Sequence, residues 1–202
     1  MYACLATRPD LSIAVNFFSQ YQSKATKVLW EGLKRILRYL QGTKNWGLWY
    51  RSHSETILVG YAVADFANGV DRKSVTGYLF KLYGNLIVWA SRKQRTVALS
   101  STEAEFIALA SAAAEYLWVK QMLQEMKVFV EEPVIMFEDN QAYIHSLVSW
   151  DQKRLKHIDI KYNFIRDLIK NKLIEVKNIE SANQMADILT KGLPFNLFNR
   201  IE

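Results

Sequence analysis

Cysteine, histidine and proline are scarce in this sequence of 202 residues, which has one cysteine, three histidines and three prolines. The single cysteine, Cys4, excludes an intrachain disulfide, and nothing indicates an oxidising compartment. No second His or Cys lies at ligand spacing from His157, which argues against a zinc site. With only eight glycines as well, the chain has no low-complexity linker.

Long apolar runs are also absent from the sequence. No uninterrupted apolar stretch reaches the roughly 18 residues that a membrane span needs. The N-terminus lacks the charged region followed by an apolar region that marks a signal peptide. We therefore expect an intracellular protein, cytoplasmic or nuclear, with no membrane partner.

The composition is that of a folded protein, with 50% hydrophobic and 23% charged residues. This is enough for one domain with an appendage. Lys and Arg number 26 against 20 Asp and Glu, so the formal net charge is +6. Such an excess fits a polyanionic partner such as nucleic acid, but many basic proteins bind no polyanion.

The hydrophobic pattern changes from helical to strand-like and then alternates between the two. We predict helices over 23–41, 101–126, 140–148, 158–170 and after Asn183, and strands over 46–50, 57–64, 76–83, 86–90, 134–138 and 173–179. Gly84-Asn85 is typical of a hairpin turn. Hairpin strands followed by strand–helix crossovers predict an α/β (mixed α+β) fold with a mixed sheet flanked by helices. Trp89, Trp118 and Tyr78 are expected in its core.

Three short acidic segments end or begin these predicted elements. They are Ser101-Thr102-Glu103-Ala104-Glu105, Glu138-Asp139-Asn140-Gln141 and Asn183-Gln184-Met185-Ala186-Asp187. Carboxylates are hard oxygen ligands that suit Mg²⁺ or Mn²⁺ better than Zn²⁺. Clusters that hold two such ions hydrolyse phosphodiesters. The same residues also have structural uses, because Asp139 can cap a helix, and Glu103 with Ser100 or Glu105 with Thr102 fits a capping box.

Several motifs in order resemble the ribonuclease H domain of Ty1/copia-type retrotransposon Pol polyproteins. They are Thr102-Glu103-Ala104-Glu105, Glu138-Asp139-Asn140-Gln141, Lys156-His157-Ile158-Asp159-Ile160 and Ala186-Asp187-Ile188-Leu189-Thr190-Lys191. Thr7-Arg8-Pro9-Asp10 and the segment 34–43 resemble the end of the preceding reverse transcriptase. The resemblance implies a remnant of the reverse-transcriptase thumb or connection region over 1–50, a ribonuclease H-like domain over 51–195 and a tail over 196–202. The sequence contains no Tyr-x-Asp-Asp motif of a polymerase palm.

The resemblance implies four carboxylates around two Mg²⁺ (or Mn²⁺) ions. Asp139 and Asp187 match two of them, and the helix carboxylate is Glu105 or Glu103, of which we favour Glu105. The family has Gly-Tyr-x-Asp-x-Asp-Trp-Ala-Gly in its first strand, where this chain has Val63 at the first Asp. Asp65 lies two residues on, roughly 6–7 Å along the strand. It would substitute only if the backbone shifted, so we expect impaired activity.

The implied function is hydrolysis of the RNA strand of RNA·DNA hybrids. The alternatives are a non-catalytic nucleic-acid-binding module, or an inactive transposon-derived relic. Other parts of a Pol polyprotein are possible partners. We expect contacts to hybrid phosphates from residues at strand ends and hairpin edges, although such residues are often only solvated: Arg72, Lys73, Arg92, Lys93, Arg95 and, near the scissile phosphate, His157.

Overall fold

Five strands form one sheet in the computed structural model, which describes residues 1–52, 58–67, 69, 71–141, 144, 159–194 and 198. The spatial order is β3-β2-β1-β4-β5. The strands are β1 (Leu58–Asp65), β2 (Val75–Leu82), β3 (Asn85–Lys93), β4 (Val134–Glu138) and β5 (Ile174–Asn178). Strands β1 to β3 pair antiparallel, whereas β4 pairs parallel with both β1 and β5. The predicted mixed sheet is therefore confirmed.

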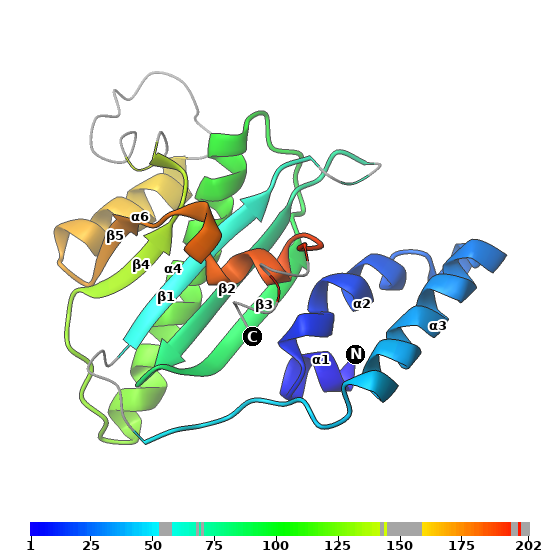
Figure 1. The fold of residues 1–202 in the computed structure, drawn as a ribbon. Helices are drawn as coiled ribbons and strands as arrows, with labels where there is room; N and C mark the ends of the chain where they lie inside the picture. Colours follow the sequence, from blue (N-terminus) through cyan, green and yellow to red (C-terminus); the bar gives the residue numbers. More distant parts are fainter. Residues whose placement is uncertain are drawn as a thin grey trace.

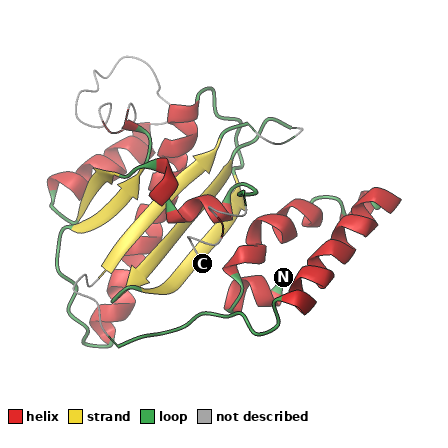
Figure 2. Ribbon diagram, in the orientation of Figure 1, coloured by secondary structure: helices red, strands yellow, loops and turns green. Residues whose placement is uncertain are grey.

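Helices cover both faces of this sheet (Figures 1 and 2). Helices α4 (Ser101–Glu125) and α6 (Asp159–Lys170) lie on one face. The short 3₁₀ helix η4 (Met185–Leu189) crosses the other face over β1 and β2. The N-terminal helices lie beside β3 and comprise α1 (Tyr2–Ala6), η1 (Pro9–Leu11), α2 (Ser12–Ser19), η2 (Gln22–Lys24) and α3 (Lys27–Gly42). Another 3₁₀ turn, η3 (Ser181–Asn183), precedes η4.

The core beneath α4 explains why this helix is long and apolar on most of its surface. Ser100 caps it, because its hydroxyl accepts a hydrogen bond from the Glu103 N–H at 3.1 Å. Leu109 and Tyr116 of α4 pack with Tyr78 and Met136 of the sheet, all fully or almost fully buried. The first residues of α4 are thereby held at one edge of the sheet.

On the opposite face of the sheet, η4 and the residue after it pack very close to the backbone of β2. A Cβ atom built on Gly77 of β2 would lie 2.5 Å from the Thr190 side chain and 2.9 Å from the Ala186 carbonyl. Only glycine therefore allows this approach. Val63 of β1 is buried in the apolar cluster of this face, together with Leu189.

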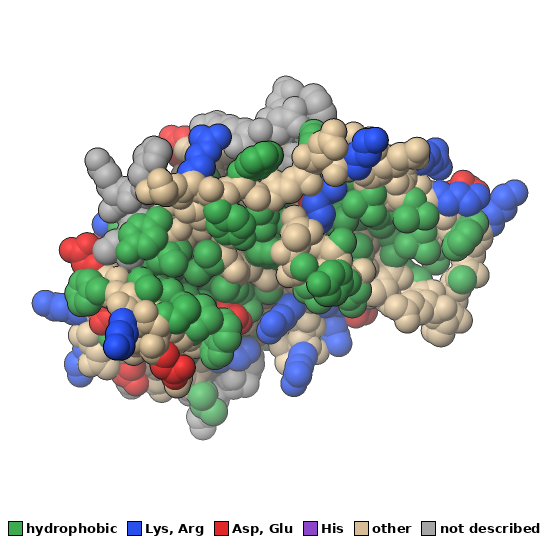
Figure 3. Space-filling model, turned by 90° about the horizontal axis from the view of Figure 1, so that it is seen from below, with side chains coloured by type: hydrophobic (Ala, Val, Ile, Leu, Met, Phe, Trp, Pro, Cys, Tyr) green, Lys and Arg blue, Asp and Glu red, His purple; other side chains and the backbone are tan. Residues whose placement is uncertain are grey.

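The N-terminal helices attach to the sheet through its β3 edge. The Trp89 indole donates to the Cys4 carbonyl at 2.8 Å, and the Asn16 amide donates to Ser91 at 3.2 Å. A connection without regular secondary structure then runs from α3 along the lower side of the molecule toward β1 (Figure 1). Seen from below, this side carries many hydrophobic side chains (Figure 3), and Trp49 and Tyr50 of the connection are exposed.

Several predicted boundaries were wrong. Residues 46–50 form part of the connection and not a strand, and α3 starts after a Thr26 cap instead of at Ser23. The hairpin turn is Tyr83-Gly84, one residue earlier than expected, because both residues adopt the positive φ that two-residue turns need. The last helix is 3₁₀.

The expectation for the core aromatic residues has a mixed outcome. Tyr78 is buried and Trp89 half-buried, but Trp118 on α4 is 55% exposed. The helix predicted over 140–148 lies mostly outside the described residues. Among the described helices, none is long and apolar enough to cross a membrane.

Candidate metal centre

The carboxyl ends of β1 and β4 lie at one edge of the sheet, because these strands are parallel and Tyr61 pairs with Phe137. Glu138 is the last residue of β4 and Asp139 follows it. Helix α4 begins at the same edge and brings Glu105 to it. One carboxylate oxygen from each of Glu105, Glu138 and Asp139 lies within 4.8 Å of the other two. Together with Asp187 we call these residues the acidic cluster.

Glu105 is held by the backbone of the first strand. Its Oε2 accepts a hydrogen bond from the Ala64 N–H at 2.6 Å, and the side chain is buried. Burial, together with the charges of Asp139 and Asp187, raises the pKa of Glu105 to about 8, although the hydrogen bond from the Ala64 N–H opposes the shift.

Glu138 is fully buried, with 0% of its surface exposed. Its Oε1 accepts a long hydrogen bond from the Asn140 N–H at 3.4 Å. Its Oε2 has no hydrogen-bond partner among the described residues. Burial, followed by repulsion from Glu105 and Asp139, raises the pKa of Glu138 well above its ordinary value.

Asp187 approaches the cluster from η4 on the other face. Its Oδ2 forms an ion pair with the Lys191 ammonium at 2.8 Å, whereas its buried Oδ1 has no partner within the described part of the chain. Burial raises the pKa of Asp187 although Lys191 lowers it, and the charges of Asp139 and Asp65 act in the same direction as burial.

Glu103 and Glu105, the two alternatives for the carboxylate contributed by the helix, have different surroundings in the structure. The Glu103 carboxylate accepts a hydrogen bond from the Leu99 N–H at 2.7 Å, and the Glu103 N–H donates to the Ser100 hydroxyl at 3.1 Å, so Glu103 supports the start of α4. Glu105, in contrast, lies in the acidic cluster with Asp139. Asp65 is half-buried at the end of β1, close enough to Asp187 for their charges to interact.

Glu138 is the member of the cluster that sequence reasoning missed. Burial alternates along β4, with Val134, Met136 and Glu138 buried and the residues between them half-buried. The available signal was that Glu138 continues the alternation of Val134 and Met136 on the buried side of the strand.

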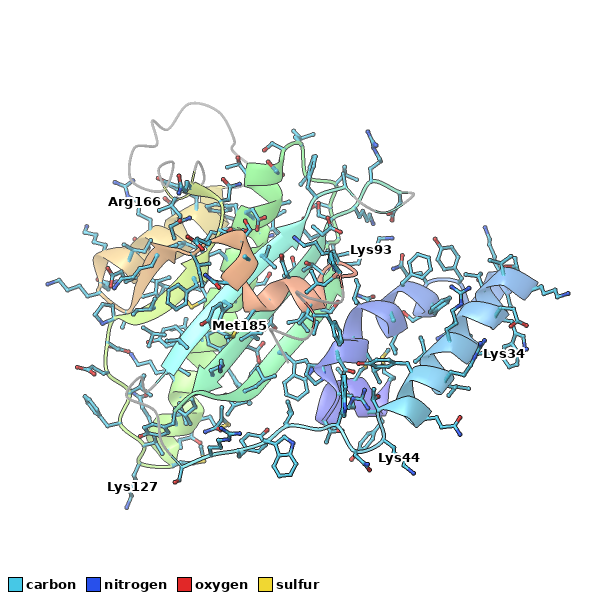
Figure 4. All side chains as sticks on the ribbon, in the orientation of Figure 1. Lys34, Lys44, Lys93, Lys127, Arg166 and Met185 are labelled. Carbon is cyan, nitrogen blue, oxygen red and sulfur yellow. The ribbon has the colours of Figure 1, made fainter. Side chains whose placement is uncertain are left out.

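The basic residues expected to bind phosphates gather at the same end of the sheet. Val75 at the start of β2 pairs with both Asp65 and Lys93, so the ends of β1 and β3 lie at one edge. Arg92 and Arg95 are exposed there, as is Arg72, whereas Lys73 is half-buried. Lys93 turns toward α2 (Figure 4) and contacts Gln20 at 2.6 Å and Asp71 at 2.9 Å. His157 lies outside the described residues.

A separate pocket of about 610 Å³ lies between the N-terminal segment and the sheet. Its lining includes Trp49, Tyr50, Trp89 and Lys81, but no residue of the acidic cluster. Burial lowers the pKa of Lys81, whose ammonium contacts the sulfur of Met185 at 3.8 Å. This pocket is therefore distinct from the candidate metal centre.

Solved structures that resemble this chain identify its fold. LC11-RNase H1, isolated from compost, matches with a TM-score of 0.51 and 16% identity over 67% of this chain and 93% of that chain. An N-terminal ribonuclease H domain from Mycobacterium tuberculosis matches with a TM-score of 0.51 and 10% identity over 73% of this chain and 96% of that chain. The sheet and its helices thus have a ribonuclease H-like fold.

Sequence relatives identify the family. The chain is 42% identical over 199 residues to the retrovirus-related Pol polyprotein from transposon TNT 1-94 of Nicotiana tabacum, and 37% identical over 189 residues to that from transposon RE2 of Arabidopsis thaliana. The chain belongs to the family of copia-type retrotransposon Pol polyproteins. These matches cover 98% and 93% of the chain, but 15% and 13% of the two polyproteins.

A shorter relative is the secreted RxLR effector protein 161 of Plasmopara viticola. It is 50% identical over 120 residues, which make up 59% of this chain and 84% of that protein. No protein-family model matches the chain.

Proposed function

We propose that this chain is a ribonuclease H that hydrolyses the RNA strand of RNA·DNA hybrids with a divalent cation, at a rate impaired by Val63. One observation carries the proposal: carboxylates that are far apart in the sequence meet at the carboxyl edge of a ribonuclease H-like sheet, with oxygens within 4.8 Å. That edge is where open α/β sheets place their sites.

The residues fit Mg²⁺ or Mn²⁺ by the chemistry of their donors. All the groups are carboxylates, and the described part of the cluster leaves two buried oxygens, Glu138 Oε2 and Asp187 Oδ1, without hydrogen-bond partners. Uncompensated buried oxygens of this kind are expensive unless a cation or a proton satisfies them. Glu105, Asp139 and Asp187 are the proposed ligands, and the family resemblance implies two ions.

The protein side chains would act mainly by positioning. Glu105, Asp139 and Asp187 would hold the divalent cation, which would supply Lewis-acid chemistry toward the phosphodiester and the attacking water. Glu105 is fixed by the Ala64 N–H and Asp187 by Lys191, so both carboxylates are oriented before substrate binds. The burial of both side chains keeps bulk water from their inner oxygens.

Hybrid binding is proposed at the edge that carries both the acidic cluster and the exposed arginines. Neighbouring strands lie about 4.8 Å apart, so the end of β3 is about 14 Å from that of β4 across the intervening β2 and β1. Arg92 and Arg95 can therefore hold phosphates of a duplex whose scissile strand lies over the cluster.

We also propose that residues 51–195 form the ribonuclease H-like domain, that 1–50 are a reverse-transcriptase remnant and that 196–202 are a tail. The described residues of both apolar clusters around the sheet, apart from Phe198, lie between Leu58 and Leu193, which supports the boundary near 50.

A second candidate is a nucleic-acid-binding module without catalysis. Val63 favours it, because an apolar side chain is buried where the resembling family has a metal-bridging Asp. This module would bind hybrids with an affinity that falls steeply with salt, and would cleave none.

Cleavage of labelled RNA in an RNA·DNA hybrid, with Mg²⁺ or Mn²⁺, tests the proposal. We expect slow cation-dependent cleavage by the wild type, faster cleavage by Val63→Asp and none by Asp139→Asn. If neither the wild type nor Val63→Asp cleaves while both are folded and bind hybrid, the binding module replaces the enzyme. If they also fail to bind hybrid at low salt, the chain is a relic.

A further inference from the structure

The family resemblance assigns no role to Glu138, although this side chain lies inside the acidic cluster. It is completely buried, and its Oε2 has no hydrogen-bond partner among the described residues. Its Oε1 accepts from the Asn140 N–H at 3.4 Å, which is a weak interaction at the limit of hydrogen bonding. A buried carboxylate with so little compensation requires a ligand or a proton.

Glu138 and Val63 come from opposite faces of the sheet. Val134 and Met136, on the same side of β4 as Glu138, pack in the core beneath α4. Glu138 therefore points toward Glu105 of α4. Val63 packs in the apolar cluster under η4. Glu138 thus adds a carboxylate from the α4 side, where Val63 could not contribute one.

We infer that Glu138 is a direct ligand of a divalent cation, which it holds together with Glu105 and Asp139 at the seam between β1 and β4. Two ligand atoms of one ion can be no farther apart than twice the bond length, about 4.2 Å for Mg²⁺ and about 5 Å for Ca²⁺. The three oxygens lie within 4.8 Å of one another, so small side-chain rotations suffice for an ion of the size of Mg²⁺ or Mn²⁺. The inference rests on the proposed function only in that both place a cation at this edge.

The cluster also has the charge to hold such an ion. The carboxylates of Glu105, Glu138 and Asp139 meet there. The ammonium group of the nearby Lys191 forms its ion pair with Asp187. A divalent ion would offset the repulsion among them and satisfy the Oε2 of Glu138 in one step. The chain would then keep a complete carboxylate site for one cation in spite of Val63.

Binding of Mn²⁺ to the full chain tests this inference without any substrate. Free Mn²⁺ is measured by electron paramagnetic resonance during a titration, and thermal unfolding is recorded with and without the ion. The variants are Glu138→Gln, which keeps the shape of the side chain, and the matched control Glu125→Gln, at the exposed end of α4. Circular dichroism verifies that each variant is folded.

We expect the wild type and Glu125→Gln to bind Mn²⁺ with similar affinity and to melt at a higher temperature with the ion. Glu138→Gln should bind at least about tenfold more weakly, since even outer partners of a metal site contribute that much. It should also unfold at a higher temperature than the wild type at neutral pH without the ion, because the free-energy cost of burying or protonating this carboxylate has been removed.

Two results would overturn the inference. If Glu138→Gln binds Mn²⁺ as tightly as the wild type, Glu138 is not a ligand, whether or not the hybrid is cleaved. If the wild type binds no Mn²⁺, the buried carboxylates share protons instead of a metal ion. Hybrid cleavage is scored separately, so Mn²⁺ binding through Glu138 without cleavage supports this inference and removes the proposed enzyme.

Discussion

At the scale of single residues, the crowding of buried carboxylates should make stability depend on pH when no cation is bound. The pKa of Glu105 rises from 4.5 to about 8 in the folded chain, and that of Glu138 also rises. Between these values the folded state binds more protons than the unfolded state. The free energy of unfolding should therefore fall as the pH increases from about 4.5 to about 8.

Thermal unfolding in EDTA across this pH range measures the effect. Glu105→Gln, which cannot ionise, should show a flatter dependence than the wild type, with a higher melting temperature at pH 8. A wild-type melting temperature that rises between pH 5 and pH 8 would show that other groups dominate the proton linkage.

Glu103 differs from Glu105 by two positions and should respond differently to substitution. Its carboxylate accepts from the Leu99 N–H and supports the start of α4. Glu103→Ala should lower the free energy of unfolding by about 1 kcal/mol, which is typical for loss of a cap. Its Mn²⁺ affinity should match that of the wild type in the titration described above. A loss of Mn²⁺ binding in a folded Glu103→Ala variant would indicate that Glu103 is a ligand of the cation.

At the scale of elements, the contact between β2 and η4 positions Asp187. Gly77→Ala would place a Cβ atom 2.5 Å from Thr190, so η4 must move away from the sheet. We expect a loss of about 1–3 kcal/mol in stability. Gly192→Ala is the matched control, because a Cβ atom there would have no heavy atom of the described residues within 4 Å, apart from its own chain neighbours. Denaturant unfolding compares the two, and equal stability would show that η4 does not rest tightly on β2.

The same scale shows which features the sequence could predict. Helix α4 was predicted within one residue, because its cap and apolar pattern are local signals. Residues 46–50 were mistaken for a strand, since aromatic side chains suggested a sheet although none of the described strands pairs with them. Glu138 was missed because its burial depends on the approach of α4, which is a tertiary contact.

At the scale of the whole molecule, the sheet and its two apolar clusters should fold without the N-terminal helices. Deletion of residues 1–50 removes the hydrogen bonds of Trp89, Ser91 and Lys93 to this region, but leaves the described residues of both clusters intact. Calorimetry should therefore show one cooperative transition, at a melting temperature lowered by several degrees. A broad, non-cooperative transition would mean that residues 1–50 belong to the same folding unit.

The distribution of positive charge over the molecule should also determine how hybrid binding depends on salt. Each phosphate contact contributes about 0.9 to the slope of log affinity against log salt for a B-form DNA duplex, and an RNA·DNA hybrid should respond similarly. Arg92 is exposed at the edge that carries the acidic cluster, whereas Lys127 lies beyond the far end of α4 (Figure 4). Arg92→Ala should reduce the slope by about 1, and Lys127→Ala should leave it unchanged.

Fluorescence anisotropy with a labelled hybrid, in a range of KCl concentrations and with Ca²⁺ to limit cleavage, gives these slopes. Lys93→Ala provides an internal comparison. Because Lys93 is already paired with Asp71, this variant should reduce the slope less than Arg92→Ala does. Equal slopes for Arg92→Ala and Lys127→Ala would place the hybrid on another surface. The duplex would then lie away from the carboxyl edge of the sheet, and the acidic cluster could not reach its RNA strand.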